Sequence, residues 1–540
     1  MDESDGDSQY RYSEDIPILQ RNYDNTVSQP ARVAGVTFDE LVDRLLAQRM
    51  SRADQNFSDI FLCLYRKFAA PGELFDAIIA RLDRVANDKN THYLIRTATQ
   101  LRIITVIAKW IAGYPGDFAS PSTSSKLDGF IQHLASQPQF AAAAQDMRYQ
   151  LHIRVMVDDD TSWARTDADA EHEQGQSAPS SPVRTRIHST NDFDQAFQKL
   201  QMDELARQRS TVESSSSGRP LSSATSLAPS FHNVEDYERA AALLSPRNTQ
   251  VLTKPRYHAL VETPDDEVAE EMTRIDWIIF SSIRMRDLFR DVSLSQSQKD
   301  KCKSLVNVKR MIDHFQYIAR WVTNMILVRD KPKHRAVAYE KFMNIAIKLR
   351  QLKNYNGLAA VLAGLNGSAI HRLGQTRSLI PADVQKKFAT LVVLMSNNKG
   401  SFAYRLAWEN SSLPRIPFIP LHRRDLTTAE QGSQTFVGTE EDRINWKKFE
   451  ILGDAILPIM KSQVVPYTGK ARDEVRDLIL DCRMLDDEVR DAILASSKFT
   501  VTCADCVIQD CYQRSVQLEG SAPVTDGGKK NFRWFQKDKS

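Results

Sequence analysis

Three cysteines near the C-terminus form the sequence's clearest candidate for a metal site. Cys503, Cys506 and Cys511 lie close together in the chain, so their thiols could meet. A structural zinc ion normally takes four ligands, and no histidine follows to supply the fourth. We therefore expect unpaired, reduced thiols here and no metal or other cofactor, with a metal site as the minor alternative.

The sequence lacks the motifs of covalent catalysis. It contains no Gly-x-x-x-x-Gly-Lys-Ser/Thr phosphate loop, no Gly-x-Gly-x-x-Gly after a strand, no His-Glu-x-x-His and no Gly-x-Ser-x-Gly. The 11 histidines are scattered along the chain. A conventional hydrolase, kinase or dehydrogenase is disfavoured, and we expect a protein that acts by binding and makes or breaks no covalent bond.

The most informative stretch begins at Leu413-Pro-Arg-Ile-Pro-Phe-Ile-Pro420. Its three prolines enforce an extended chain. Thr427-x-x-Glu430 then has the form of a capping box, which predicts a helix that starts where the prolines end. Gly432 can end that helix, so we predict that it is short.

A second helix is predicted from Ile444 onward, because apolar residues recur there at three-residue steps. Trp446, Phe449 and Leu452 form its apolar side. The two helices should be antiparallel and held away from the main bundle by rigid arms. An ordinary hairpin inside the core is the alternative.

Helical periodicity dominates the elements that must position this stretch. Six apolar stripes recur at three- and four-residue steps, whereas few segments alternate like strands. We therefore predict an all-α protein of stacked amphipathic helices. The stripes are Phe57–Phe68, Leu74–Leu82, Leu101–Ile111, Val268–Ile283 with Met311–Met325, and Ala338–Leu352.

Composition and charge exclude several broad classes. Hydrophobic residues make up 42% and charged residues 26%, which is ordinary for a globular chain. Lys+Arg 71 against Asp+Glu 69 leaves a formal charge of +2, so no bulk field favours nucleic acid. The N-terminus has no secretory signal, and the longest apolar runs are far shorter than a membrane span. We expect a cytoplasmic protein.

Changes in composition predict two helical domains joined by a disordered linker. Asp158-Asp-Asp160 opens an acidic, apolar-poor run that also contains four consecutive serines, so it cannot bury enough surface to fold. The predicted parts are a disordered N-terminus (1–33), a small helical bundle (34–155), the linker (156–263), a large helical domain (264–520) and a basic, aromatic tail (521–540).

Three segments resemble one family. Asn354–Leu373 resembles the central signature of Ras-family guanine-nucleotide exchange factors, and the stretch from Pro417 to Trp446 resembles their catalytic helical hairpin. Phe57–Phe68, followed by Pro71, is similar to the N-terminal helical module that accompanies such domains. Two separate signatures in the right order make a chance similarity improbable.

The resemblance implies how such a chain would act. In this family the helical hairpin inserts beside the phosphate and Mg²⁺ site of a small GTPase and moves one switch loop away, while a groove on the main bundle grips the other. The implied partner is a Ras- or Rap-type GTPase, bound most tightly when it is free of nucleotide. No nucleic acid is expected, and recruitment to the inner face of the plasma membrane is left open.

Particular residues match the family's functional positions. The implied catalytic residues lie in the hairpin, where Thr427 would point toward the Mg²⁺ site. Core packing or helix capping is about as plausible for each groove residue taken alone. The hairpin residues are Thr427, Glu430, Gln431, Gly432 and Ser433, and the residues implied to bind the GTPase are Phe418, Ala359, Asn366, Arg372 and Tyr404.

The sequence departs from the family pattern at two places. Gln431 stands where a family member carries an acidic residue that competes with phosphate, and a neutral amide cannot mimic that charge. Glu430 should be occupied with the helix cap. About twenty residues (489–511) also intervene before Tyr512–Leu518, which suggests an inserted loop or an unspliced intron.

Two further functions compete with exchange. A scaffold that binds a GTPase without ejecting its nucleotide is the main alternative, because Gln431 lacks the acidic charge. Membrane or nucleic-acid binding through the basic, aromatic tail is a more distant one. The hairpin sequence Glu430–Phe436 is similar to those of factors that act on Rap-type GTPases, but the substrate stays open between Ras and Rap types.

Overall fold

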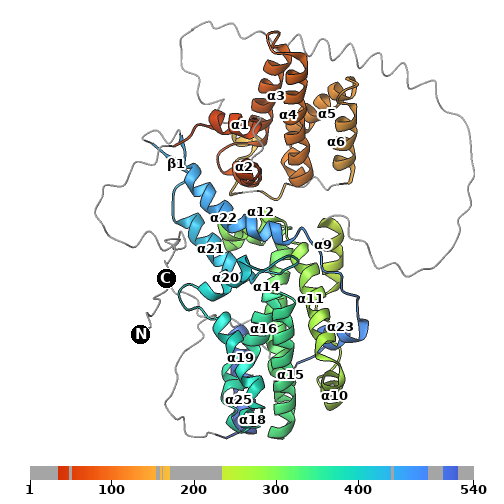
Figure 1. Cartoon of the computed structure of the whole chain (residues 1–540), viewed down its shortest axis with the longest axis vertical. Helices are drawn as coiled ribbons and strands as arrows, with labels where there is room; N and C mark the ends of the chain where they lie inside the picture. The colour runs from red at the N-terminus through yellow and green to blue at the C-terminus, as the bar shows by residue number, and fades with distance from the viewer. Residues whose placement is uncertain are drawn as a thin grey trace, which may run out of the picture. The chain divides into compact units, whose positions relative to one another are not determined.

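The computed structural model describes residues 35–47, 52–153, 158–160, 162–170, 234–438, 443–484 and 503–520. Most of these residues lie in helices and very few lie in strands, which confirms the all-α prediction (Figure 1). The predicted N-terminal lead, most of the linker, the basic tail and residues 489–502 of the proposed insertion lie outside the described residues.

The N-terminal module is a set of helices that share one apolar core. Prolines occupy the first turns of α3, η3 and α5, where the missing N–H costs nothing. The module consists of α1 (Phe38–Leu46), α2 (Arg52–Leu64), η2 (Tyr65–Lys67), α3 (Pro71–Asn87), α4 (Tyr93–Gly113), η3 (Pro115–Phe118), α5 (Pro121–Ala135) and α6 (Ala141–Ile153).

The predicted stripes of the module are largely confirmed. The apolar residues of Phe57–Phe68 are buried, as are Leu74, Phe75 and Ile78. Leu101 was wrongly placed on the buried face of α4, because its side chain is 41% exposed. The buried face of that helix runs instead through Ile103, Ile104, Ile107, Trp110 and Ile111.

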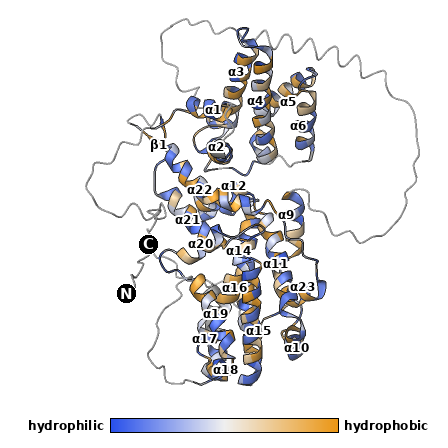
Figure 2. Ribbon diagram, viewed as in Figure 1, coloured by the Kyte–Doolittle hydropathy of each residue, from blue (hydrophilic) through white to orange (hydrophobic). Residues whose placement is uncertain are grey.

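The larger part is built around three helices that pack against one another. Figure 1 shows α14 (Leu305–Leu327), α15 (Pro332–Gln351) and α16 (Tyr355–Leu365) side by side, and Figure 2 shows α16 as strongly hydrophobic. A Cβ on Gly364 would lie 2.6 Å from the carbonyl oxygen of Ala319, so glycine allows α16 to cross α14 this closely.

The remaining helices surround this core. They are α9 (Val234–Leu243), α10 (Lys254–Glu262), α11 (Asp265–Ser281), α12 (Met285–Ser293), α13 (Gln296–Lys299), α17 (Ser368–His371), α18 (Gly374–Ser378), α19 (Ala382–Leu394), α20 (Phe402–Glu409), α21 (Ile419–Gln431), α22 (Trp446–Ser462), α23 (Asp473–Leu480) and α25 (Cys503–Leu518).

Two parts of the range assigned to the linker are folded. Helices α9 and α10 lie within 156–263 and pack against α11, α15 and α23. Asp160, expected to open the linker, is buried and carries ion pairs. Composition missed these elements because both helices are short and polar, and because the partners of Asp160 lie far away in the sequence.

The predicted helical hairpin consists of α21 and α22. Between them, β1 (Phe436–Val437) pairs antiparallel with β2 (Arg443–Ile444), and Val36 forms a further bridge to Ile444. The capping-box prediction is wrong, because α21 begins at Ile419 and not at Thr427. Pro420 fits within the first helical turn, so the proline stretch ends inside the helix.

The end of α21 and the face of α22 follow the predictions. Gly432 is the residue at which α21 ends. Trp446, Phe449 and Leu452 are buried, which confirms the apolar side of the second helix. Among the described helices, none is long and apolar enough to cross a membrane.

Candidate functional site

The hairpin tip, residues 427–433, combines exposed and anchored side chains. Gln431, Gly432 and Ser433 are exposed, whereas Thr427 and Glu430 are half-buried. The Thr427 hydroxyl donates to the carbonyl oxygen of Arg423 at 3.0 Å, which is an internal bond of the helix and not a cap. A partner that meets the tip would therefore first encounter the amide of Gln431 and the hydroxyl of Ser433.

Glu430 anchors the tip to two lysines. Its Oε1 lies 2.8 Å from Nζ of Lys67 in η2, and its Oε2 lies 3.3 Å from Nζ of Lys448 in α22. The expected helix-capping role is therefore wrong, because this carboxylate joins α21 to the N-terminal module. Burial lowers the pKa of Lys448, while the carboxylate of Glu430 opposes that shift.

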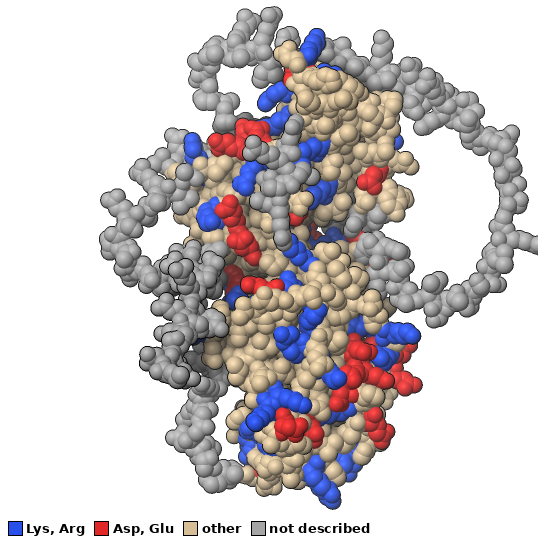
Figure 3. Space-filling model, viewed as in Figure 1, with Lys and Arg blue, Asp and Glu red and all other residues tan. Residues whose placement is uncertain are grey.

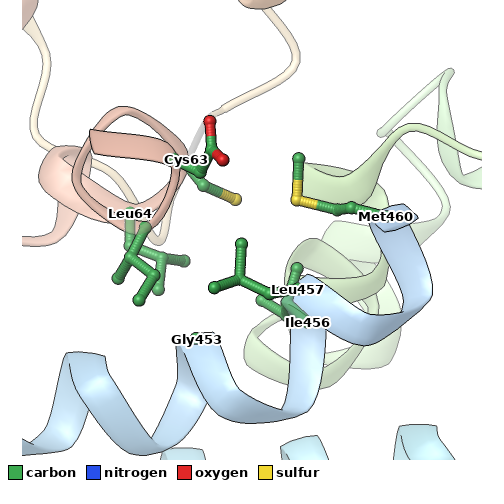
Figure 4. A pocket seen from close by; sticks show the side chains of 8 residues that line it. Cys63, Leu64, Gly453, Ile456, Leu457 and Met460 are labelled. Carbon is green, nitrogen blue, oxygen red and sulfur yellow. The ribbon is translucent and has the colours of Figure 1, made fainter. Parts of the chain in front are cut away.

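An apolar contact between α2 and α22 fixes the second helix of the hairpin. The rings of Phe57 and Trp446 have centroids 4.7 Å apart. A Cβ on Gly453 would lie 2.2 Å from Cδ1 of Ile60, so any larger residue would force the Ile60 side chain or α2 itself to shift. Figure 4 shows Cys63 and Leu64 facing Ile456, Leu457 and Met460 around this glycine.

A buried ionic cluster ties the N-terminal module to α12. Nη1 of Arg286 lies 2.6 Å from Oδ1 of Asp117 and 2.6 Å from Oδ2 of Asp160. Arg66 pairs with Asp117 at 2.9 Å, and Arg290 pairs with Asp160 at 2.5 Å. Burial opposes ionisation of both aspartates, but the arginines hold the pKa of each below its ordinary value.

This cluster also bears on the hairpin, because α12 packs directly against α21. Arg423 of α21 forms an ion pair with Asp291 of α12. Arg286 further donates to the carbonyl oxygens of Cys63 at 3.1 Å and Leu62 at 2.7 Å, at the end of α2. Both helices of the hairpin are thus fixed by the N-terminal module, α22 directly and α21 partly through α12.

The root of α21 is held by buried aromatic and polar contacts. The hydroxyl of Tyr404 accepts the Phe418 N–H at 2.8 Å and lies 2.8 Å from Nε2 of His422. The ring of Phe418 packs on Phe315, with centroids 5.8 Å apart. Burial lowers the pKa of His422 to about 4, which keeps the imidazole neutral, and raises the pKa of Tyr404.

The structure does not bring all predicted GTPase-binding residues to one surface. Phe418, Tyr404 and Ala359 are buried, and Asn366 and Arg372 are half-buried. Buried side chains can touch a partner only where their packing opens. The observed contacts of Phe418 and Tyr404 therefore support α21, and direct contact with a GTPase stays a prediction.

Arg372 is linked to the C-terminal helix α25. Its Nη1 donates to the carbonyl oxygen of Glu519 at 2.8 Å. The carboxylate of Glu519 accepts bonds from Arg335 at 2.7 Å and from the Thr376 hydroxyl at 2.5 Å. Figure 1 shows α25 and α21 in separate regions, so this residue lies away from the hairpin tip.

The structure adds functional candidates that the sequence did not indicate. Lys67, Asp117 and Arg286 position the hairpin, but their partners lie far away in the chain. No local pattern could have paired them. Gly453 lies inside a helix, which is the one local signal of a close contact.

Other candidate chemistry is absent from the described part of the chain. No group of three or more potential metal ligands occurs among those residues. Cys511 is buried and not in a disulfide, whereas the side chains of Cys503 and Cys506 lie outside the described residues. Figure 3 shows acidic and basic side chains interspersed on the visible face, consistent with the formal charge of +2.

The exposed tip of the α21–α22 hairpin is fixed from behind by a separate helical module, and both belong to an all-helical protein. Residues 267–450 match the RasGEF domain, and residues 32–133 match the RasGEF N-terminal motif. Together the two matches cover more than half of the chain. It belongs to the family of Ras-type guanine-nucleotide exchange factors.

Relatives of this chain include exchange factors named for both Ras and Rap. Ras guanine nucleotide exchange factor A of Dictyostelium discoideum is 26% identical over 477 residues, which cover 87% of this chain and 64% of that protein. Ras guanine nucleotide exchange factor B of the same organism is 24% identical over 513 residues, covering 94% and 30%.

Rap guanine nucleotide exchange factor 3 of Homo sapiens is 33% identical over 189 residues, which cover 35% of this chain and 20% of that protein. The chain therefore spans less than two thirds of the length of each of these three relatives.

Proposed function

We propose that this chain promotes GDP release from a Ras- or Rap-type small GTPase by inserting the tip of the α21–α22 hairpin beside the nucleotide phosphates and Mg²⁺. The observation that carries the proposal is the exposed tip at Gln431–Ser433, set on a helix that Glu430 locks to the N-terminal module. Relatives named for Ras and for Rap support this substrate class.

The proposed mechanism needs a rigid hairpin. A mobile tip would lose conformational entropy on entering the GTPase, and that loss would weaken binding. Here the ion pairs of Glu430, the contact of Phe57 with Trp446 and the α2–Gly453 packing fix the hairpin before the partner arrives. Preorganisation of this kind leaves more of the binding free energy for displacing nucleotide.

Exchange of this type is stabilisation of the nucleotide-free GTPase, with no bond made or broken in this chain. By linkage, this chain weakens the binding of nucleotide to the GTPase by the same ratio as nucleotide weakens the binding of this chain to the GTPase. Each tenfold effect requires about 1.4 kcal/mol of preference for the empty GTPase. In this proposal the nucleotide-free form is therefore the tightest partner.

Individual tip residues take distinct roles in the proposal. Thr427 faces the Mg²⁺ region. Gln431 and Ser433 form hydrogen bonds with the groups of the GTPase that otherwise donate to the phosphate. Because Gln431 is uncharged, displacement rests more on steric exclusion than on mimicry of a phosphate. The groove that grips the other switch loop of the GTPase is supported or lined by Phe418, Ala359, Asn366, Arg372 and Tyr404.

The direct test is release of fluorescent GDP from purified Ras-type and Rap-type GTPases, with the full chain added at increasing concentration. Acceleration for one type establishes catalysis and identifies the substrate class. Acceleration of neither type, with no binding to either nucleotide-free GTPase, contradicts the proposal. The Lys126→Met variant, altered at an exposed ion pair of the N-terminal module, serves as the control.

A scaffold that binds the GTPase without ejecting nucleotide is the second candidate, and Gln431 favours it. A Gln431→Glu variant restores an acidic tip, and Gln431→Met is the matched uncharged change. If lost charge limits displacement, the Glu variant accelerates GDP release and the Met variant does not. Tight binding to the nucleotide-free GTPase with no release by any variant identifies the scaffold.

A further inference from the structure

The surface between α15 and α19 forms a groove of about 430 Å³ that lies outside the hairpin site. This volume is within the range of small-ligand pockets, roughly 300–1,000 Å³. Ile347 and Leu391 supply an apolar floor. Arg350, Lys386 and Lys387 supply three cationic groups around it.

None of these three cations has a carboxylate partner among the described residues. By contrast, Arg66, Arg286 and Arg290 of the ionic cluster described above are neutralised by aspartates. Asp383 lies one turn before the lysines on α19 but does not line the groove. Converging positive charges of this kind favour a multiply charged anion.

Arg350 is partly preordered for such a ligand. Its guanidinium carbon lies 5.1 Å from the centroid of the Tyr355 ring, and its side chain is half-buried. Stacking on an aromatic ring limits the rotamers of the side chain while leaving its N–H donors available. A phosphate monoester is the anion that matches such planar donors flanked by two ammonium groups.

We propose that this groove binds the phosphorylated headgroup of an anionic membrane lipid. Exposed apolar side chains lie on α19 and on the helix that packs against it, which favours a bilayer over a free phosphate. Val393 lies two residues after Leu391 and is 63% exposed, and the neighbouring helix α20 exposes Phe402 and Leu406. Basic groups next to exposed apolar side chains are typical of surfaces that lie in a membrane interface.

The proposal places membrane recruitment in the folded domain. The C-terminal sequence after residue 526 also carries Lys, Arg and aromatic residues, but it lies outside the described residues and is not part of this site. The groove and that segment can be tested separately, because a substitution in α19 leaves the C-terminal sequence intact. Exchange in solution is independent of the groove, so the two proposals fail separately.

The test is binding of the full chain to phosphatidylcholine vesicles with and without phosphatidylinositol bisphosphate. The key variant is Lys386→Gln/Lys387→Gln, since both side chains are exposed and glutamine keeps the helix. Lys89→Gln/Lys126→Gln removes the same charge from the N-terminal module and is the control. A variant lacking residues 527–540 measures the contribution of the C-terminal sequence.

Each lysine near an anionic surface changes partitioning about fivefold, so the α19 variant should bind the phosphoinositide vesicles about 25-fold more weakly. The control variant should bind within about fivefold of the unaltered chain. GDP release measured in solution should be unchanged in the α19 variant.

Three outcomes would overturn the proposal. Equal vesicle binding by the α19 variant and the unaltered chain removes the groove from lipid binding. Binding of soluble inositol trisphosphate at the groove without any vesicle binding identifies a free phosphate ligand. Faster GDP release by the α19 variant in solution identifies an acidic segment of a protein as the occupant.

Discussion

The contact of Lys67 with Glu430 offers the sharpest test of how the N-terminal module controls the hairpin. The change is Lys67→Met, which removes the ammonium group and keeps most of the side-chain volume. Glu430 then keeps only the longer of its two ion pairs, to Lys448 at 3.3 Å. We expect the end of α21 to be held less firmly, although the tip residues are unaltered.

The magnitude follows from the burial of the pair. Lys67 and Glu430 are 16% and 12% exposed, and their charged atoms are 2.8 Å apart. Exposed pairs contribute about 0–1 kcal/mol, whereas breaking a fully buried pair costs about 3–5 kcal/mol. With Lys448 remaining, we expect about 1–2 kcal/mol. That corresponds to a fall of about 5–30-fold in kcat/KM where the docked hairpin limits exchange.

The assay is a double-mutant cycle on GDP release, because Glu430 could also touch the GTPase. Lys67→Met, Glu430→Gln and the double variant are compared by kcat/KM. If both residues act through their contact, the double variant loses no more activity than the worse single variant. Hydrogen exchange of the α21 amides should rise in the same variants, which reports docking without reference to the GTPase.

The control is Lys126→Met, which breaks a 2.8 Å ion pair to Asp76 on the exposed side of the same module. It should leave kcat/KM within about fivefold of the unaltered chain. Losses that add in the double variant, or unchanged α21 protection in Lys67→Met, would refute the argument that this pair holds the hairpin.

Three further predictions address the packing behind the hairpin. Gly453→Ala places a methyl group against Ile60. We therefore expect the free energy of unfolding to fall by about 1–3 kcal/mol and GDP release to slow, and adding Ile60→Ala should partly restore both. If the second substitution restores neither, the damage does not arise from the contact with Ile60. His422 has a folded pKa of about 4, below its ordinary value, so its contribution to stability is present above about pH 6.5 and is lost as the pH falls toward 4. Between pH 7 and 4, the free energy of unfolding of the unaltered chain, measured by chemical unfolding, should therefore fall by about 3 kcal/mol more than that of His422→Gln. Parallel plots of unfolding free energy against pH for the two chains would contradict this. Asp160→Asn leaves Arg286 with a weaker buried partner, so we expect the Tm to fall by several degrees. Asp76→Asn, which alters an exposed ion pair, is the control. An equal fall in Tm for the two variants would contradict the prediction.

The sequence was sufficient for elements that depend on short-range periodicity. The stripes at Phe57–Phe68 and Met311–Met325 and the apolar side of α22 are buried as predicted, because a spacing of three or four places residues on one helical face. Burial decides such patterns almost regardless of context. The end of α21 at Gly432 was predictable for a similar local reason.

The start of α21 shows where local rules mislead. Thr427-x-x-Glu430 has the form of a capping box, but a helix that begins at Ile419 already passes through it. Inside a helix, the threonine hydroxyl bonds to the carbonyl four residues earlier. Glu430 is then free to pair with Lys67, a partner that no window of sequence contains.

The ionic cluster around Arg286 has a consequence beyond stability. A buried ion pair often adds little net free energy, but loss of one partner is costly. Arg286 contacts Asp117 and Asp160 on one side and belongs to the helix that packs on α21 on the other. Displacement of the N-terminal module would take Asp117 away from Arg286 next to the hairpin, whereas Arg290 would keep Asp287 of its own helix. Such a contact favours one docked arrangement over a range of partly docked ones, so the hairpin should be held in place or released as a unit.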